Sequence, residues 1–108
     1  MPNQTNVSAE TLLKQIVNIF TAWGTPQDYA NTAAEVMVDT DLRGIESHGV
    51  GMLSTYYKWW HEDNRFVLDA PIQILRDLPS IALVDGGHGL GHPIAVKAME
   101  IAIEKCRE

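Results

Sequence analysis

The sequence is poor in several features that mark particular classes of protein. Its single cysteine, Cys106, cannot form an internal disulfide, which suits a reducing compartment. Residues 1–6 carry no basic and apolar leader, and nowhere do about 18 apolar residues run together, so neither a secretory signal nor a membrane span is expected. The sequence therefore predicts a cytoplasmic protein with no membrane partner.

Positive charge is also scarce. Lysine and arginine number 8 against 14 aspartates and glutamates, which gives a net charge of −6 over 108 residues. Binding to a phosphate backbone needs a basic face, so this balance argues against a nucleic-acid partner. The 45% hydrophobic content is that of an ordinary globular protein, and a chain of this length buries about 65% of its unfolded surface, enough for one modest core.

Apolar residues in the first part of the chain recur with helical spacing. Ser8 is a candidate N-cap for a helix that ends near Gly24. Thr25 is predicted to cap a second helix, with Pro26 at its first position, that runs to about Asp41. One face of this second helix is a stripe of mostly small residues: Ala30, Ala33, Ala34 and Met37. Small side chains allow close packing, so the two helices are expected to form an antiparallel hairpin.

A third helix is predicted over residues 50–62, ending near Asn64. It belongs with a dense group of aromatic residues: Tyr56, Tyr57, Trp59, Trp60 and Phe66. Because few basic residues interleave with these rings, we interpret them as core or subunit interface rather than as a platform for nucleic-acid bases.

The second part of the chain has the pattern of strands followed by a helix. Residues 71–74 and 81–84 are predicted as a hairpin of two short strands, and Pro93 is predicted to open a last helix. The expected class is α+β (mixed α/β), with a helical segment at 1–64 and strands, a glycine-rich loop and a helix at 65–108. An α/β unit normally continues with a further strand, so the chain is expected to be a piece of a longer protein.

A glycine-rich stretch separates the second strand from the last helix: Gly86, Gly87, His88, Gly89, Gly91 and His92. Backbone N–H groups in such a loop, together with a helix N-terminus, can hold a phosphate or carboxylate. The strict dinucleotide pattern would place glycine at position 92, where His92 stands, and the P-loop pattern also fails. The alternative is that the glycines only form a tight connection between strand and helix.

His88 and His92 are four residues apart, a spacing that places two imidazoles on one face of a helix. Because Pro93 marks the start of the helix, we do not expect both to be helical. With no third ligand nearby in the sequence, no metal site is predicted. Cys106, late in the last helix, is interpreted as a small apolar filler.

The triplet Ser47-His48-Gly49 is a second candidate site, in another segment rich in glycine. Imidazole has a free pKa near neutrality, and the glycine lets a substrate approach its ring, so His48 is a candidate general acid or base. The alternative is that Ser47 caps a helix and His48 is simply exposed.

Three separated stretches resemble one family: residues 41–50 (DLRGIESHGV), 84–91 (VDGGHGLG) and 98–105 (AMEIAIEK). They resemble the malate/L-lactate dehydrogenase family that lacks a Rossmann domain. This family also contains ureidoglycolate and sulfolactate dehydrogenases and diketogulonate reductase. The resemblance runs in order over essentially the whole chain and corresponds to roughly the N-terminal third of a member.

The resemblance implies an NAD- or NADP-dependent enzyme that interconverts a 2-oxo acid and a 2-hydroxy acid. In the family the histidine of the Ser-His-Gly motif protonates the carbonyl oxygen, which assigns that role to His48, with Ser47 as its hydrogen-bond partner. Many members hold the substrate carboxylate with an arginine four residues after this histidine, where this sequence has Met52. Arg43 is the motif's candidate for binding the substrate. Some members assign the main acid or base to a histidine that would fall beyond Glu108.

The family also implies where other parts of the site lie. Residues 86–92 correspond to a loop near the site and the subunit contact, at the start of the cofactor or substrate domain, whereas the main nicotinamide-binding segments come later in the family chain. Members are typically homodimers with the active site between subunits, so a homodimer is expected and the chain alone is expected to be inactive. The competing hypothesis is a non-enzymatic, acidic helical module that dimerises or binds an anion at residues 86–92.

Overall fold

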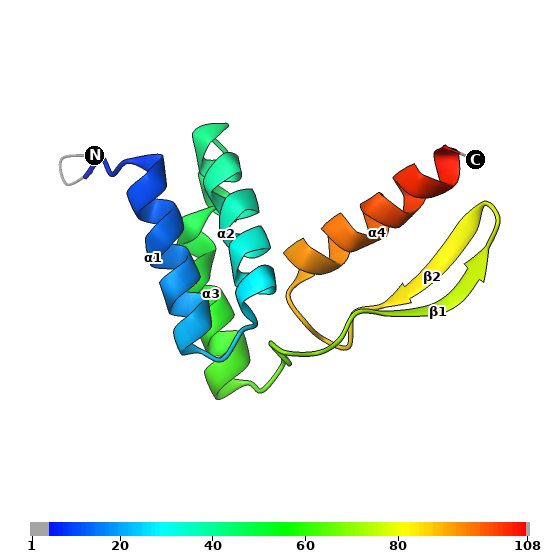
Figure 1. Ribbon diagram of the computed structural model, residues 1–108. Helices are drawn as coiled ribbons and strands as arrows, with labels where there is room; N and C mark the ends of the chain where they lie inside the picture. The colour runs from blue at the N-terminus through cyan, green and yellow to red at the C-terminus, as the bar shows by residue number, and fades with distance from the viewer. Residues whose placement is uncertain (1–4, 108) are drawn as a thin grey trace.

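The computed structural model describes residues 5–107, which contain helices and one antiparallel hairpin of strands (Figure 1). In chain order the elements are α1 (Ala9–Ala22), α2 (Gln27–Leu42), α3 (Leu53–Tyr57), β1 (Gln73–Leu78), β2 (Ile81–Asp85) and α4 (Gly91–Cys106). Shorter helical turns lie at Glu46–His48, Val50–Met52 and Lys58–Glu62. None of the helices in this part of the chain combines the length and apolar character needed to cross a membrane. The arrangement confirms the predicted α+β class.

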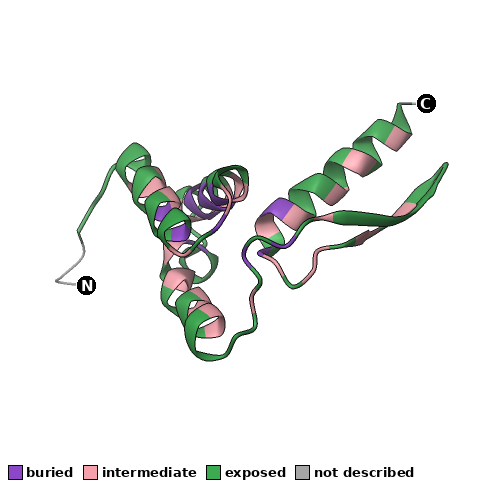
Figure 2. Ribbon diagram, turned by 60° about the horizontal axis from the view of Figure 1, so that its bottom comes forward, coloured by how far each residue is buried: buried purple, intermediate pink, exposed green. Residues whose placement is uncertain are grey.

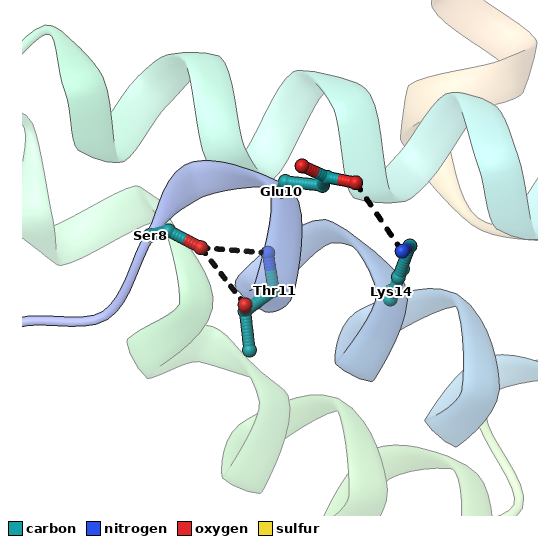
Figure 3. A network of polar contacts seen from close by, with 4 residues as sticks. All are labelled: Ser8, Glu10, Thr11 and Lys14. Carbon is teal, nitrogen blue, oxygen red and sulfur yellow. Dashed lines mark hydrogen bonds and ion pairs between the residues drawn. The ribbon is translucent and has the colours of Figure 1, made fainter.

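α1 begins where the sequence predicts. The Ser8 hydroxyl oxygen accepts a hydrogen bond from the Thr11 backbone N–H at 3.2 Å, and the two hydroxyl groups bond at 2.8 Å (Figure 3). Such a cap contributes about 1 kcal/mol. Glu10 and Lys14 form an exposed ion pair at 3.3 Å, which adds little because water screens it. The assignment of Ser8 as N-cap is confirmed.

The link between α1 and α2 differs from the prediction at two residues. α2 begins at Gln27 with Pro26 as its N-cap, so Pro26 as first helical residue is wrong. Thr25 as cap is wrong too, because its buried hydroxyl oxygen has no hydrogen-bond partner among the described residues. The cause is the end of α1, where Gly24 lies at φ +98° and the Thr25 N–H donates to the Phe20 carbonyl at 3.0 Å. This Schellman ending takes Thr25 into the interior.

α1 and α2 run antiparallel and share the core (Figure 1). The small-residue stripe of α2 is fully buried, since Ala30, Ala33 and Ala34 expose no surface. Ile16 and Phe20 of α1 belong to the same cluster and are also fully buried; Figure 2 shows buried positions on both helices. Alanine lets the backbones approach, and the larger side chains of α1 fill the remaining space. The predicted helical hairpin is confirmed.

The predicted third helix is present but is not uniform. Residues 50–62 form a 3-10 turn, then α3, then a π-helical turn, and Asn64 follows at φ 52°. The rings of Trp23 and Trp60 stack with their centroids 5.3 Å apart, and Tyr56 meets Phe66 edge-on at 5.9 Å. Tyr56, Trp60 and Phe66 pack against the core, which confirms the core interpretation for these three rings, whereas Tyr57 is exposed.

β1 and β2 pair as the predicted hairpin, but β1 lies later in the sequence than expected. It extends to Leu78, which pairs with Ile81 across a two-residue turn. A bulge between Ile74 and Arg76 shifts the register. The charged residues Arg76 and Asp77 interrupt the apolar pattern from which a strand is predicted. Every residue of β1 is exposed, so this strand does not need alternating apolar and polar residues.

α4 lies along the hairpin, and its N-terminal half lies near α2 (Figure 1). It begins at Gly91, so Pro93 as first helical residue is wrong; proline is tolerated throughout a first turn, where N–H groups have no acceptor within the helix. Lys105 donates to the Asp77 carboxylate and so ties α4 to the hairpin. Cys106 is exposed, and its interpretation as a filler is wrong because this end of α4 extends beyond the core (Figure 2).

The hairpin and α4 form an arm, residues 73–106, that projects from the helical body of residues 9–62 (Figure 1). The radius of gyration is 15.6 Å, whereas a compact domain of about 100 residues has about 13 Å. Large apolar side chains of the arm are exposed as a result, among them Leu75, Ile81 and Met99. An isolated hairpin is only marginally stable, so the arm depends on α4 for its order.

Replacing Phe20 with alanine is expected to lower the free energy of unfolding by about 3–5 kcal/mol, because the ring is fully buried and its loss leaves a cavity. Urea unfolding followed by circular dichroism measures the change. Ile103→Ala on α4 is the control, and because that side chain is 47% exposed it is expected to cost about 0.5 kcal/mol. Equal stability of the two variants would contradict the core described here.

Candidate functional site

The candidate acid or base, His48, lies on a short helical turn between α2 and α3. Glu46–His48 form this turn, and the side chains of Ser47 and His48 are exposed. The Ser47 hydroxyl oxygen lies 2.8 Å from Nδ1 of the His48 ring, which is hydrogen-bonding distance. Ser47 therefore bonds the imidazole and is not the N-cap of the turn, a position held by Ile45. Because the bond occupies Nδ1 and orients the ring, Nε2 is the nitrogen available for proton exchange.

The end of α2 fixes the near side of this turn, by which we mean the backbone that leads from α2 to His48. Gly44 lies at φ +80°, a left-handed conformation that glycine adopts without strain. Its N–H donates to the Asp41 carbonyl at 2.9 Å, and the Ile45 N–H donates to the Thr40 carbonyl at 3.1 Å. The His48 N–H then donates to the Ile45 carbonyl at 3.1 Å. This Schellman ending hydrogen-bonds the backbone before His48 to the last turn of α2.

Arg43, the candidate for binding a substrate carboxylate, is directed back along α2. Its Nε donates to the Asp39 carboxylate at 2.8 Å, and both side chains are exposed. An exposed pair of this kind contributes about 0.5 kcal/mol, so another carboxylate can replace Asp39 at small cost.

The glycine-rich loop uses its backbone groups within the protein. The Gly87 N–H donates to the Asp85 carboxylate at 2.9 Å, and the Gly89 N–H donates to the Gly86 carbonyl at 3.0 Å. A side chain at Gly86 would overlap Ile94 of α4. The N–H groups of Gly87 and Gly89 therefore have acceptors within the protein, and Gly86 packs closely against α4. The geometry supports the alternative of a tight connection.

His92 lies in the first turn of α4, whereas His88 lies in the loop at φ 64°, so the two imidazoles are not on one helical face. The His92 ring packs edge-on against Tyr56 with centroids 5.8 Å apart, and its Nδ1 is buried without a hydrogen-bond partner among the described residues. Burial lowers the pKa of His92 and raises that of Tyr56. Within residues 5–107, no three His, Cys, Asp or Glu side chains are grouped to hold a metal ion.

His92 and Tyr56 line an open and mostly apolar groove of about 410 Å³. The groove lies beside the start of α4, and its other walls come from Val36, Phe66, Leu90, Gly91, Ala95, Val96 and Met99. Figure 1 shows that the loop between β2 and α4 lies away from the end of α2, where the Glu46–His48 turn begins. The candidate residues therefore form two separate places in the fold, the Ser47–His48 turn and the loop with His92.

Asp41 was not predicted from the sequence as a functional residue. It holds the far side of the His48 turn, which is the backbone that follows His48. Its carboxylate accepts a hydrogen bond from the Val50 N–H at 2.8 Å. The signal in the sequence was an acidic residue in the last turn of a helix, where the negative end of the helix dipole disfavours it.

Comparison with known proteins gives a consistent result. The sequence profile of a family described as malate/L-lactate dehydrogenase matches residues 7–108. A malate dehydrogenase of Pyrococcus abyssi is 39% identical over 98% of this chain and 29% of its own length. An L-sulfolactate dehydrogenase of Methanothermobacter thermautotrophicus is 39% identical over 94% of this chain and 29% of its own length.

A solved structure shares the arrangement of the chain. The malate dehydrogenase of Pyrococcus horikoshii superposes with a TM-score of 0.89 and 36% identity, over 95% of this chain and 29% of that protein. The chain thus spans less than a third of the length of the relatives that it matches.

Gly86→Ala is expected to lower the free energy of unfolding by about 1–3 kcal/mol, because the new methyl group overlaps Ile94. Gly91→Ala is the matched control, since no atom lies within 4 Å of the added carbon and alanine favours the helix. Thermal unfolding of both variants measures the difference. If the two substitutions were tolerated equally, the packing role of Gly86 would be wrong.

The stability of the protein is expected to fall as the pH drops below about 6.5, partly through His92. The unfolded chain binds a proton on this ring more readily than the folded protein, where burial lowers the pKa, so the stabilisation is complete above the unfolded pKa and is lost below it. Urea unfolding at a series of pH values measures the dependence. His92→Gln should weaken it, His88→Gln on the exposed loop should not, and identical curves for wild type and His92→Gln would refute the assignment.

Proposed function

Because the chain belongs to the malate/L-lactate dehydrogenase family, we propose that it serves an oxidoreductase that interconverts a 2-oxo acid and a 2-hydroxy acid with NAD or NADP. The observation that carries this proposal is the exposed Ser47–His48 pair, whose hydroxyl oxygen and Nδ1 lie 2.8 Å apart. It offers one oriented imidazole nitrogen to a small molecule. The names of the relatives, malate and sulfolactate dehydrogenases, support this class of substrate.

His48 is the proposed proton donor. Reduction of a 2-oxo acid adds a hydride to the carbonyl carbon and a proton to the carbonyl oxygen. In the imidazolium form, Nδ1–H donates to the Ser47 oxygen, which leaves Nε2–H to protonate the substrate. In the reverse direction the neutral ring accepts the proton of the hydroxyl group. A positioned acid of this kind contributes about 10²–10⁴-fold to the rate.

Arg43 is the proposed partner of the substrate carboxylate. Its guanidinium is exposed close to His48 in the sequence and is held by Asp39 in an exposed pair. If a substrate carboxylate takes the place of Asp39, Arg43 exchanges one ion pair for another. The pair with the substrate is the stronger if it is bidentate. Met52, which stands where many members of the family carry an arginine, has no charge to offer.

The nicotinamide cofactor supplies the hydride when it is bound. In the loop with Gly86, Gly87, His88, Gly89 and Gly91, the Gly87 and Gly89 N–H groups have acceptors within the protein, and Gly86 packs against Ile94. We therefore propose that this loop and His92 shape the neighbourhood of the cofactor and do not hold its phosphates. We also propose a boundary between a helical segment (1–64) and the start of a cofactor or substrate domain (65–108), because the helical turns end at Glu62 and β1 begins at Gln73.

We propose further that the protein is a cytoplasmic homodimer with its active site at the subunit interface. The exposed apolar side chains of the arm, such as Leu75 and Ile81, support burial against more protein. Ser47 and His48 of the helical body are exposed as well, so a neighbouring subunit has access to the proposed proton donor.

Replacing His48 with glutamine is expected to lower kcat of the complete enzyme by about 10²–10⁴-fold with little change in the KM for the cofactor. The measurement is oxidation of NADH or NADPH against a panel of 2-oxo acids. His61→Gln, another exposed histidine of the helical body, serves as the control and should keep the wild-type rate. An unchanged kcat for His48→Gln would remove the proposed role.

A further inference from the structure

The far side of the His48 turn is attached to α2 by a single carboxylate. Asp41, in the last turn of α2, accepts the N–H of Val50 on Oδ2 at 2.8 Å, nine residues along the chain. Val50 begins the helical run that continues through α3. As the first residue of that run, Val50 has no acceptor for its N–H within the run. Asp41 supplies the missing acceptor from another helix.

Gly49 fits this attachment for a steric reason. It is buried, and a Cβ built on it would overlap the Asp41 carboxylate. Its φ of −94° lies outside the left-handed region that favours glycine. The glycine after His48 is therefore required by the approach of the Asp41 carboxylate, and access of a substrate to the ring is not needed to account for it.

The backbone on both sides of His48 is thus anchored to the same turn of α2. On the near side the Ile45 N–H donates to the Thr40 carbonyl at 3.1 Å. On the far side the Val50 N–H donates to the Asp41 carboxylate. Two fixed ends leave the exposed His48 little freedom to shift, although its own side chain contacts only Ser47 among the hydrogen bonds described above.

We propose that Asp41 is a positioning residue, which fixes the place of His48 through the backbone of Gly49 and Val50. The inference rests on the proposed role of His48 as proton donor. Asp41 does not take part in proton transfer itself, because its two oxygens face Gly49 and Val50 rather than the imidazole. Displacement of a catalytic group by about 1 Å can cost 10²-fold in rate, so a hydrogen bond that only holds the backbone is able to control turnover.

The first test compares Asp41→Ala with Asp41→Asn. Alanine removes the acceptor, whereas asparagine keeps a carbonyl oxygen for the Val50 N–H. Asp41→Ala is expected to shift the Val50 amide and His48 ring resonances in NMR spectra and to lower kcat by about 10–100-fold, with an unchanged KM for the cofactor. Asp41→Asn should recover most of the rate. Glu35→Ala, an exposed carboxylate of α2, is the control and should change neither.

The second test uses Gly49→Ala in two backgrounds. In the wild type the new methyl group displaces the Asp41 carboxylate and should lower kcat as far as Asp41→Ala does. In the Asp41→Ala background the three carboxylate atoms that the methyl group would overlap are gone, so adding Gly49→Ala should cause a clearly smaller further loss than it does in the wild type. An equal additional loss in both backgrounds would overturn the proposal, as would unchanged Val50 and His48 resonances in Asp41→Ala.

The two proposals can fail separately. If His48→Gln leaves kcat unchanged, the function proposed for His48 fails, whatever Asp41 does. If His48→Gln lowers kcat but the Asp41 and Gly49 variants keep the wild-type rate and spectra, the dehydrogenase role stands and the positioning role of Asp41 fails.

Discussion

The close approach of α1 and α2 is the contact on which the rest of the structure depends. Ala30, Ala33 and Ala34 bring the backbone of α2 against the cluster that contains Ile16 and Phe20, and all five side chains are fully buried. Most of the buried core lies in this pair of helices, and the other elements are added to it. α4 lies near α2, and the rings of Tyr56, Trp60 and Phe66 pack on the same cluster.

The C-terminal ends of α1 and α2 determine the direction of the chain that follows, and so they place the candidate site on the packed helices. α1 and α2 both finish with a glycine at positive φ, Gly24 and Gly44, and with the backbone bonds of a Schellman ending. After α1 the chain returns as α2, and after α2 it enters the turn with His48. α2, which is buried along one face, is therefore followed by an exposed imidazole on a backbone anchored at both ends. This is the kind of rigid support that a proton donor needs.

Local patterns predicted much of this fold. The cap at Ser8, the small-residue stripe of α2 and the hairpin of strands follow from neighbouring residues, and the structure has them. Thr25, Pro26 and Pro93 were misplaced because the ends of neighbouring elements, rather than the residue's own preference, decide which position is capped. Cys106 was misjudged since helical periodicity does not tell how far a core extends.

The candidate site, too, could be predicted from the sequence only in part. Ser47 and His48 are adjacent, so their hydrogen bond was foreseeable, whereas the attachment of Val50 to Asp41 joins residues nine positions apart and needs the path of the turn to be known. The glycines of residues 86–91 suggested a phosphate site, but a sequence does not show whether loop N–H groups have acceptors within the protein.

The central claim is that the α1–α2 packing holds the His48 turn, and amide hydrogen exchange tests it most directly. The amides of Ile45 and Val50 are expected to exchange as slowly as those in the middle of α2, because they are released only when α2 opens. The amides of β2 should exchange faster, since the hairpin lies outside the core. Rapid exchange at Ile45 and Val50 while α2 stays protected would show that the turn moves independently, and would contradict the account.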